Sequence, residues 1–394
     1  MRENFLTLYD VLPNLSEIMS IHIKTVSSTS ELKTFVRFGN RLYKGNRYYV
    51  PSMPWDDLNT FNPKKNGAFE FSDAELYLAL KEGKVVGRVA AIVNHKANEA
   101  WHVKQVRFGW IDFIDDMEVS AALLHAVEEF GRKHGMDQIV GPLGFTDFDP
   151  EGMLVEGFDR VGTMALIYNH PYYPEHMKHH GYVKETGWLE YRINIPDKLP
   201  ERHIKLAEIL KERNGFKIRK LTRRQIRKEN YGQKLFRLIN ETYSSLYGYS
   251  LLSERQIDMY VDVYLGLIDL KMVSFIENAE GELIAAGVSM PSLADALQKC
   301  NGKIFPFGWY HLLKSIFWKK PDTLDLLLIG VKPEYQNKGV NALIIMDLFH
   351  TYRSMGFKYA ETNANLETNH KVQAMWDPFE KEQHKKRWVF GKAL

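Results

Sequence analysis

The same order of apolar patterns occurs twice along the chain. Residues 75–94 and 271–290 each contain two stretches of alternating apolar and polar positions, joined by a tight turn with glycine, which predicts two β-hairpins. After the first hairpin we expect a strand at 106–113, an amphipathic helix and the short strand DQIVG. After the second we expect a strand at 324–331, a helix that stops at Gly356, and the strand FKYAET. In each set the strands on either side of the helix should pair in parallel.

This repeat predicts an α/β (α+β) fold with two units in tandem. The likeliest junction by composition is IPDKLP, residues 195–200, where two prolines bracket a polar turn. We therefore expect an N-terminal extension at 1–20, a first unit at 21–195 and a second unit at 196–394. The second unit carries an insertion at 292–320 between its hairpin and its next strand.

Length and composition agree with two domains, in a chain of 394 residues that is 45% hydrophobic and 26% charged. The formal charge is only +3, from 52 basic and 49 acidic residues, so the global balance indicates no polyanion-binding role. One cysteine, Cys300, excludes an intramolecular disulfide framework and fits a reducing compartment. Apolar runs are far shorter than the roughly 20 residues of a bilayer span, and 1–20 lack the features of a signal peptide, so we expect a cytoplasmic protein.

The segment 324–349 carries the pattern with the most chemical content. The strand is followed by a turn with Pro333, by the run Gln336-Asn337-Lys338-Gly339-Val340-Asn341, and by an amphipathic helix. The start of a helix presents unpaired backbone N–H groups and the positive end of its dipole, which together hold a pyrophosphate. Gly339 lets the backbone approach the phosphates, and Lys338 adds a positive charge.

This combination of strand, proline turn, Gln-x-x-Gly and helix resembles the cofactor motif of the GNAT acyltransferase superfamily. The resemblance implies that each unit is a mixed, mostly antiparallel sheet with a parallel, splayed strand pair and flanking helices. It also implies acetyl-CoA or a longer acyl-CoA as the acyl donor, bound by the second unit, and no metal. The implied cofactor-binding residues are Ile329, Gly330, Val331, Gln336, Asn337, Lys338, Gly339, Val340, Asn341 and Asn369. Asn341 departs from the Gly or Ala that is usual at its position.

The same resemblance implies three catalytic candidates, Asp325, Asn369 and Trp376. Asp325 lies on the strand where some members carry a carboxylate base, and a backbone N–H near residues 330–331 would hold the oxyanion. Asn369 corresponds to a residue that hydrogen-bonds the pantetheine arm. Trp376 stands where many members have a tyrosine acid, and indole cannot donate that proton. Another group then serves as the acid, or the thiolate leaves without one.

Each catalytic candidate also has an alternative interpretation. Asp325 is equally a solvated strand position, and Trp376 is equally a core or acyl-packing aromatic. Glu361 and His370 are further candidates for the base.

The first unit has acids where the second has its phosphate loop. The stretch 113–124 contains Asp115, Asp116 and Glu118 and no glycine, so it would repel a pyrophosphate. We predict that the first unit binds no cofactor and shapes the acceptor side. The Gly-rich loop 141–162 supplies four carboxylates that can meet an amine, namely Asp147, Asp149, Glu151 and Glu156. The histidines between 170 and 180 lack ligand spacing, so no metal site is expected.

The segment 303–321 interleaves six aromatic residues with lysines. Such a segment is a buried helix, a channel for an acyl chain, or a peripheral membrane contact. Either of the last two would favour a lipid-like amine as substrate. The tandem layout and the acidic loop resemble two-unit bacterial proteins that include long-chain N-acyltransferases of the bacterial ceramide-synthase type.

Two basic clusters favour a different class of function. Residues 217–230 and 385–387 are rich in Lys and Arg, and such clusters suit RNA. Fem-type ligases, which also have tandem GNAT units, take aminoacyl-tRNA, but they generally do not depend on the phosphate loop. We therefore predict an acyl-CoA-dependent N-acyltransferase acting on a primary amine, with nucleic acid not expected as a partner. The alternatives are a Fem-type transferase and a catalytically silent acyl-CoA-binding protein. The sequence does not determine the oligomeric state.

Overall fold

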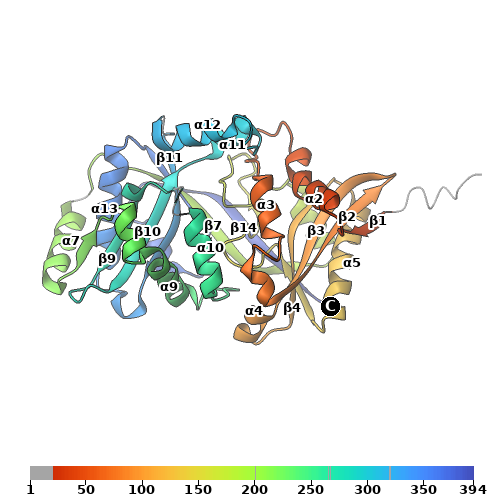
Figure 1. Cartoon of the computed structure of the whole chain (residues 1–394), viewed down its shortest axis with the longest axis horizontal. Helices are drawn as coiled ribbons and strands as arrows, with labels where there is room; N and C mark the ends of the chain where they lie inside the picture. The colour runs from red at the N-terminus through yellow and green to blue at the C-terminus, as the bar shows by residue number, and fades with distance from the viewer. Residues whose placement is uncertain (1–20, 200, 265, 267, 319–320) are drawn as a thin grey trace, which may run out of the picture.

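The computed structural model describes residues 21–199, 201–264, 266, 268–318 and 321–394. The expected extension 1–20 lies outside the described residues, as do residues 200, 319 and 320 of the predicted junction and insertion. One sheet of 14 strands runs through the described part, with helices on both faces (Figure 1). No helix in these ranges is long and apolar enough to cross a bilayer.

The first half, residues 21–195, begins with a four-stranded meander. Its strands are β1 (His22–Thr25), β2 (Ser72–Lys81), β3 (Lys84–Asn94), β4 (Gln105–Phe113), β5 (Gln138–Gly141), β6 (Met153–Glu156) and β7 (Val183–Asn194). Its helices are α2 (Thr29–Leu42), α3 (Pro54–Thr60), α4 (His95–Trp101), α5 (Met117–Lys133) and α6 (Tyr172–His179), with a 3-10 turn at Gly67–Glu70. The buried face of α5 packs on β3 and β4 around Leu123 and Val127, as its apolar periodicity predicts.

The second half repeats this order with more helices. Its strands are β8 (Lys217–Arg219), β9 (Val273–Glu277), β10 (Leu283–Pro291), β11 (Thr323–Val331), β12 (Tyr359–Thr362), β13 (Asn365–Leu366) and β14 (Lys381–Ala393). Its helices are α7 (Glu201–Asn214), α8 (Arg223–Lys228), α9 (Tyr231–Tyr243), α10 (Glu254–Tyr264), α11 (Ala294–Cys300), α12 (Gly308–Leu313), α13 (Val340–Ser354) and α14 (His370–Ala374). Short 3-10 turns occur at Leu270–Met272 and Pro333–Tyr335, and a π-helical turn at Lys314–Trp318.

Both predicted hairpins and both predicted parallel pairs are confirmed. The hairpins are β2–β3 and β9–β10. Strand β4 pairs in parallel with β5 across α5, and β11 pairs in parallel with β12 across α13. The second pairing extends only from Thr323↔Tyr359 to Leu326↔Thr362. Beyond Leu326 the two strands separate, which is the splay that the resemblance implied.

The two expected sheets are joined into one by an exchange of long strands. Strand β14, from the end of the chain, lies between β5 and β7 of the first half, and β7 pairs in turn with β12 of the second half. The C-terminus therefore lies beside α5, far from the rest of the second half (Figure 1). Strand β7 of the first half pairs with β12 of the second, and β14 of the second half pairs with β5 and β7 of the first. Neither half therefore has a complete sheet on its own.

Buried ion pairs lie on the β7–β14 pair. Glu190 of β7 is fully buried and accepts a hydrogen bond from Arg387 Nε at 2.5 Å, while Lys385 Nζ lies 3.4 Å from its other oxygen. Burial alone would raise the pKa of Glu190, but Arg387 and Lys385 outweigh it and hold this pKa below its usual value. Lys385 also contacts Glu361 of β12 at 3.1 Å. These charges tie the exchanged strands to both halves.

We predict that Glu190→Gln strongly destabilises the fold. The substitution keeps the shape of the side chain but leaves Arg387 buried without its carboxylate, which should lower the free energy of unfolding by about 3–5 kcal/mol. The measurement is urea unfolding followed by circular dichroism. Glu382→Gln is the matched control, because Glu382 lies on β14, the partner strand of β7, and pairs with Arg160 at 2.6 Å, but both side chains are well exposed. Its loss should stay below about 1 kcal/mol. Equal losses for the two variants would contradict a structural role for the buried pair.

Candidate active site

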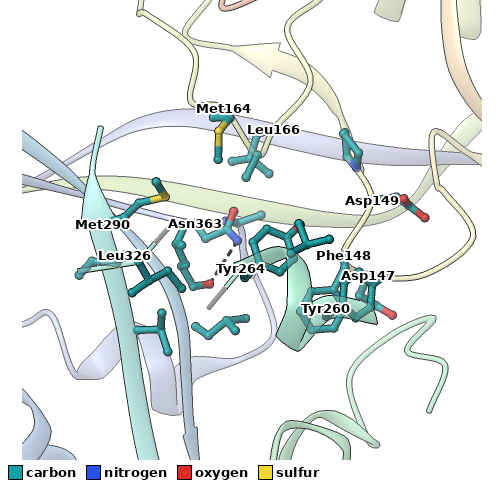
Figure 2. Close-up of a pocket in the computed structure, with 18 of the residues that line it drawn as sticks. Asp147, Phe148, Asp149, Met164, Leu166, Tyr260, Tyr264, Met290, Leu326 and Asn363 are labelled. Atoms are coloured by element: carbon teal, nitrogen blue, oxygen red, sulfur yellow. Dashed lines mark hydrogen bonds between the residues drawn. The ribbon is translucent and has the colours of Figure 1, made fainter. Parts of the chain in front are cut away.

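A large cavity of about 1230 Å³ lies between the two halves and is lined mostly by apolar side chains. The second half contributes Met290 and Leu326 on one side, and helix α10 contributes Tyr260 and Tyr264 (Figure 2). Loop residues of the first half close the cavity from the opposite side, among them Met164, Leu166, Asp147, Phe148 and Asp149. Neither half could form this cavity alone.

The splay between β11 and β12 opens into the cavity. The register of β10 with β11 shifts between Val288↔Leu328 and Ser289↔Leu326, which leaves Leu327 as a β-bulge. Since the pairing with β12 ends at Leu326, the other edge of β11 has no partner strand from residue 327 onward, ahead of the predicted residues 330–331, and the Leu327 carbonyl accepts instead from Asn363 Nδ2 at 3.4 Å. Ile329 lies on this edge and lines the cavity, and its N–H and C=O both bond to the hydroxyl of Tyr243, at 3.3 and 3.1 Å.

The turn before α13 has the geometry of an anion site. Asn337 and Gly339 adopt left-handed φ angles of 65° and 76°, and Gly339 is the N-cap of α13 without a side chain that caps the helix. The Ala342 N–H donates to the Gly339 carbonyl at 3.0 Å, which leaves the N–H groups of Val340 and Asn341 in the first turn for a ligand. Lys338 is exposed beside them. These features fit a pyrophosphate, as the sequence pattern predicts.

Gln336 lies next to this turn, and Asn369 and Trp376 line the cavity. Gln336 donates from Nε2 to the Val331 carbonyl at 3.3 Å and accepts from Lys371 at 3.1 Å. Asn369 caps α14 by accepting from the Val372 N–H at 3.3 Å, and it lines the cavity. Trp376 also lines the cavity, is 4% exposed, and has no hydrogen-bond partner for Nε1 among the described residues. The structure thus brings Ile329, Asn369 and Trp376 to one cavity. The turn before α13, which fits a pyrophosphate, follows Ile329 closely in the sequence.

Asp325, the predicted base, faces a smaller space. It is 5% exposed and lines a separate pocket of about 10 Å³ with Thr163 and Glu361. Burial, together with the neighbouring Glu361, raises the pKa of Asp325 to about 7, and its Oδ1 has no hydrogen-bond partner within the described part of the chain. Six of the nine residues that line this pocket, among them Leu326 and Leu327, also line the large cavity, so the two spaces are adjacent, but Asp325 itself lines only the smaller one. Of the two further candidates, Glu361 shares this pocket, and His370 is exposed at the start of α14.

A group of carboxylates lines the first-half side of the cavity. Three belong to the predicted acidic loop, Asp147, Asp149 and Glu151, and two belong to α3, Asp56 and Asp57. Burial raises the pKa of Asp147 to about 6 and that of Asp149 to about 7, and it raises the pKa of Glu151 well above its ordinary value. The fourth predicted carboxylate, Glu156, is exposed and lies 3.6 Å from Lys386, so it does not belong to the group.

Three functional candidates could not be recognised from the sequence. Asp56 and Asp57 follow Pro54 in the first turn of α3, where acids are common for reasons of helix stability alone. Tyr243 lies at the end of α9, about 85 residues before the strand that it contacts, and burial raises its pKa to about 12. No local motif marks it, because its position depends on the packing of α9 against β11.

The two basic clusters and the start of α5 carry other roles. Lys385 and Arg387 are buried in the ion pairs of the central strands, so interpreting 385–387 as an RNA-binding cluster is wrong. In the other cluster, Lys220 pairs with Asp347 at 2.6 Å.

At the start of α5, Asp116 accepts from the N–H groups of the helix and pairs with Lys81. That helix start is capped and acidic, in contrast to the start of α13.

No family model matches the chain, but two known proteins are similar over almost its whole length. Protein YghO from Escherichia coli (strain K12) is 25% identical over 379 residues, which cover 94% of this chain and 95% of that protein. The bacterial ceramide synthase of Caulobacter vibrioides is 25% identical over 391 residues, which cover 97% of this chain and all of that protein.

Solved structures show which fold these elements form. A tandem GNAT protein from the clavulanic acid biosynthesis pathway superimposes with a TM-score of 0.54 at 12% identity, over 95% of this chain and 98% of that one. A GCN5-related glucosamine N-acetyltransferase region of a fungal enzyme gives a TM-score of 0.53 at 11% identity, over 97% of this chain and 38% of that one. The chain therefore has a tandem GNAT-like fold, as its cofactor motif implied.

We predict that Asp149→Asn stabilises the protein above neutral pH. The folded-state pKa of about 7 lies above the unfolded value near 3.9, so the folded protein binds more protons between these values and loses stability as the pH rises through them. An asparagine removes this cost and still accepts the bond from the Thr146 N–H. The variant should be more stable than the wild type by up to about 4 kcal/mol at pH 8 and nearly equally stable near pH 4, since each unit of pKa shift corresponds to about 1.4 kcal/mol. Thermal unfolding at the two pH values measures the difference.

Asp159→Asn is the control for this prediction, because Asp159 lies in the same half and its side chain is largely exposed. Its effect should stay within about 0.5 kcal/mol at both pH values. A destabilised Asp149→Asn variant at pH 8 would contradict the prediction, because it would show that the fold requires the carboxylate.

Proposed function

We propose that this protein transfers an acyl group from acyl-CoA to the amino group of a long-chain amine. The observation that carries the proposal is one continuous cavity that joins the free edge of β11 to the carboxylates of the first half. Its volume of about 1230 Å³ exceeds the roughly 300–1,000 Å³ of most small-molecule sites, and its walls are apolar, which favours a substrate with a long hydrocarbon chain. The similarity to a bacterial ceramide synthase supports the same class, because a ceramide is the N-acyl amide of a long-chain amino alcohol.

The second half has the residues to hold the donor. The uncapped start of α13 and Lys338 would bind the phosphates, and the edge at Ile329 with Asn369 would bind the pantetheine arm. The hydroxyl of Tyr243 now occupies the backbone groups of Ile329, so it has to yield them when the arm binds. The donor would supply a thioester, whose carbonyl the Ile329 N–H could polarise once Tyr243 releases it.

The first half has the residues to hold the acceptor. The carboxylates of the cavity attract an ammonium group, and attack on the thioester requires that group to lose its protons. Asp149 lines the cavity while its Oδ2 accepts from the Thr146 N–H at 3.0 Å, and its pKa of about 7 lets it accept a proton at neutral pH. Asp325 has a similar pKa but faces the smaller pocket. We therefore assign the proton transfer to Asp149 and retain Asp325 as the competing candidate.

The departing sulfur needs a proton less than the amine needs a base. A thiol of pKa about 8–9 leaves readily as a thiolate. The Tyr243 hydroxyl nevertheless bonds to Ile329 on this strand edge, and we propose it as the group that protonates the sulfur in the absence of a tyrosine at position 376. In this proposal Trp376 serves as a wall of the cavity.

The test of this function is an acylation assay with purified protein. Palmitoyl-CoA with a long-chain amino alcohol should give the amide, detected by mass spectrometry, together with free CoA, whereas acetyl-CoA with a short amine should react much more slowly. Binding of acyl-CoA without any product would favour the silent binding protein, and transfer from aminoacyl-tRNA without CoA binding would favour the Fem-type alternative.

The pH dependence of this reaction distinguishes the two candidate bases. A carboxyl with a pKa of about 7 is protonated at lower pH, so kcat/KM should fall as the pH drops below 7. Asp149→Asn should lower kcat by about 100-fold or more and remove this limb of the profile. Asp325→Asn should keep the limb. The opposite result would assign the base to Asp325.

A second prediction concerns the cofactor site. Asn341→Asp adds a negative charge in the first turn of α13, which suits the helix dipole and should preserve the fold. The same charge repels a pyrophosphate, so the affinity for free CoA, measured by calorimetry, should fall about tenfold. Ser30→Asp places the same charge in the first turn of α2 and should leave CoA binding unchanged. Unchanged binding in Asn341→Asp would place the phosphates elsewhere.

A further inference from the structure

The described part of the predicted insertion forms a bridge between the two halves. It consists of α11, α12 and the turn Lys314–Trp318, and lies at the upper edge of the molecule between the halves (Figure 1). Its inner face lines the cavity through Ile304, Leu312 and Ile316. Gln298 of α11 donates to the carbonyls of Arg47 and Tyr49 in the first half, each at 2.9 Å. The inner face is therefore fixed by contacts to both halves.

The outer face of this bridge is exposed and aromatic. Phe305, Phe307 and Trp318 are 80%, 74% and 67% exposed. Trp309, Tyr310 and Phe317 on the same segment are also exposed. Among the described residues, these six make up half of the twelve large hydrophobic side chains that are exposed, although they fall within 14 positions. An exposed apolar patch of this density marks an interaction surface.

The charges of the bridge indicate which kind of partner its outer face would bind. The twenty residues 299–318 contain three lysines, Lys299, Lys303 and Lys314, and no Asp or Glu. In a chain with nearly equal numbers of acidic and basic residues, this stretch is positive by composition. Lys314 Nζ lies 5.5 Å from the ring centre of Tyr310, so charge and aromatic surface are intermingled. Aromatic rings that sit at the headgroup level beside lysines that attract anionic lipids are typical of a membrane surface contact.

We propose that the outer face of residues 299–318 docks on an anionic lipid bilayer. Met53 of the first half packs in the same apolar cluster as Leu312 and Ile316, and the next tryptophan, Trp55, lines the cavity and is 54% exposed. The cavity therefore reaches the surface beside the bridge. Docking would turn this opening toward the bilayer, and a long-chain substrate would enter from the lipid. That last consequence rests on the proposed function, whereas the docking does not.

Vesicle binding tests the docking without any substrate. The full-length protein is sedimented with vesicles of phosphatidylcholine and phosphatidylglycerol in roughly a 3:1 ratio, and with phosphatidylcholine alone. We expect binding to the mixed vesicles, weaker binding to the neutral ones, and a decrease at high salt. The combined variant Phe307→Ser, Phe317→Ser and Trp318→Ser should lose at least about tenfold in partitioning, because it removes apolar area that enters the interface.

The matched control removes exposed apolar side chains elsewhere. Val183→Ser with Ile209→Ser should bind vesicles as the wild type does, since Val183 and Ile209 are equally exposed but lie outside the bridge. Thermal unfolding of each variant checks that the fold is retained. Equal vesicle binding by the bridge variant and the wild type would overturn the proposal, as would a wild type that stays in the supernatant. A wild-type dimer that the bridge variant converts to a monomer, with no vesicle binding, would assign the face to a second copy.

Activity in detergent separates this proposal from the proposed function. With detergent-dispersed substrates the bridge variant should keep the wild-type rate, because none of the three replaced residues lines the cavity. Vesicle binding without any acyl transfer would leave the docking surface intact and refute only the enzyme activity.

Discussion

The pairing of β7 with β14 is the interaction on which the rest of the structure depends. These strands are the only link through which the sheet of one half continues into the other within the described residues. Their alignment is fixed by Glu190, which lies between Arg387 and Lys385. All three side chains are buried, so water cannot solvate these charges in place of the ion pairs. A slip of one residue would move these side chains to the opposite face and leave them unpaired in an apolar environment.

This alignment also creates the cavity. The loop that carries Met164 and Leu166 lies between β6 and β7, so its position is set by the same pairing. It closes over Leu326 and the splay of β11 and β12, which belong to the other half. The strand exchange thus does more than connect two units, because it brings the carboxylates of the first half into the space that faces the free edge of the second.

The local features of the fold could be predicted from the sequence, and the exchange could not. Hairpins, parallel pairs and the turn at Gly339 follow from patterns within about 30 residues, where periodicity and glycine placement are informative. Strand β14 pairs with residues almost 200 and 250 positions earlier, and no pattern in its sequence specifies these partners. For the same reason, Lys385 and Arg387 resemble a surface cluster in the sequence, and Tyr243 and Asp57 carry no mark of the cavity that they line.

The carboxylates of the cavity constrain what can bind there. Asp147, Asp149 and Glu151 have raised pKa values because burial disfavours their charged forms, and Arg107, the nearby cation, donates its bonds to the carbonyls of Gly144 and Gly248. A cationic ligand would lower these pKa values, and by linkage its binding would release protons from the site near neutral pH. The affinity of an amine that enters as ammonium should therefore increase as the pH rises through 6–7. Under the proposed function, an apolar cavity that ends in buried carboxyls would suit an amphiphile with a cationic end, and the same groups would accept its proton.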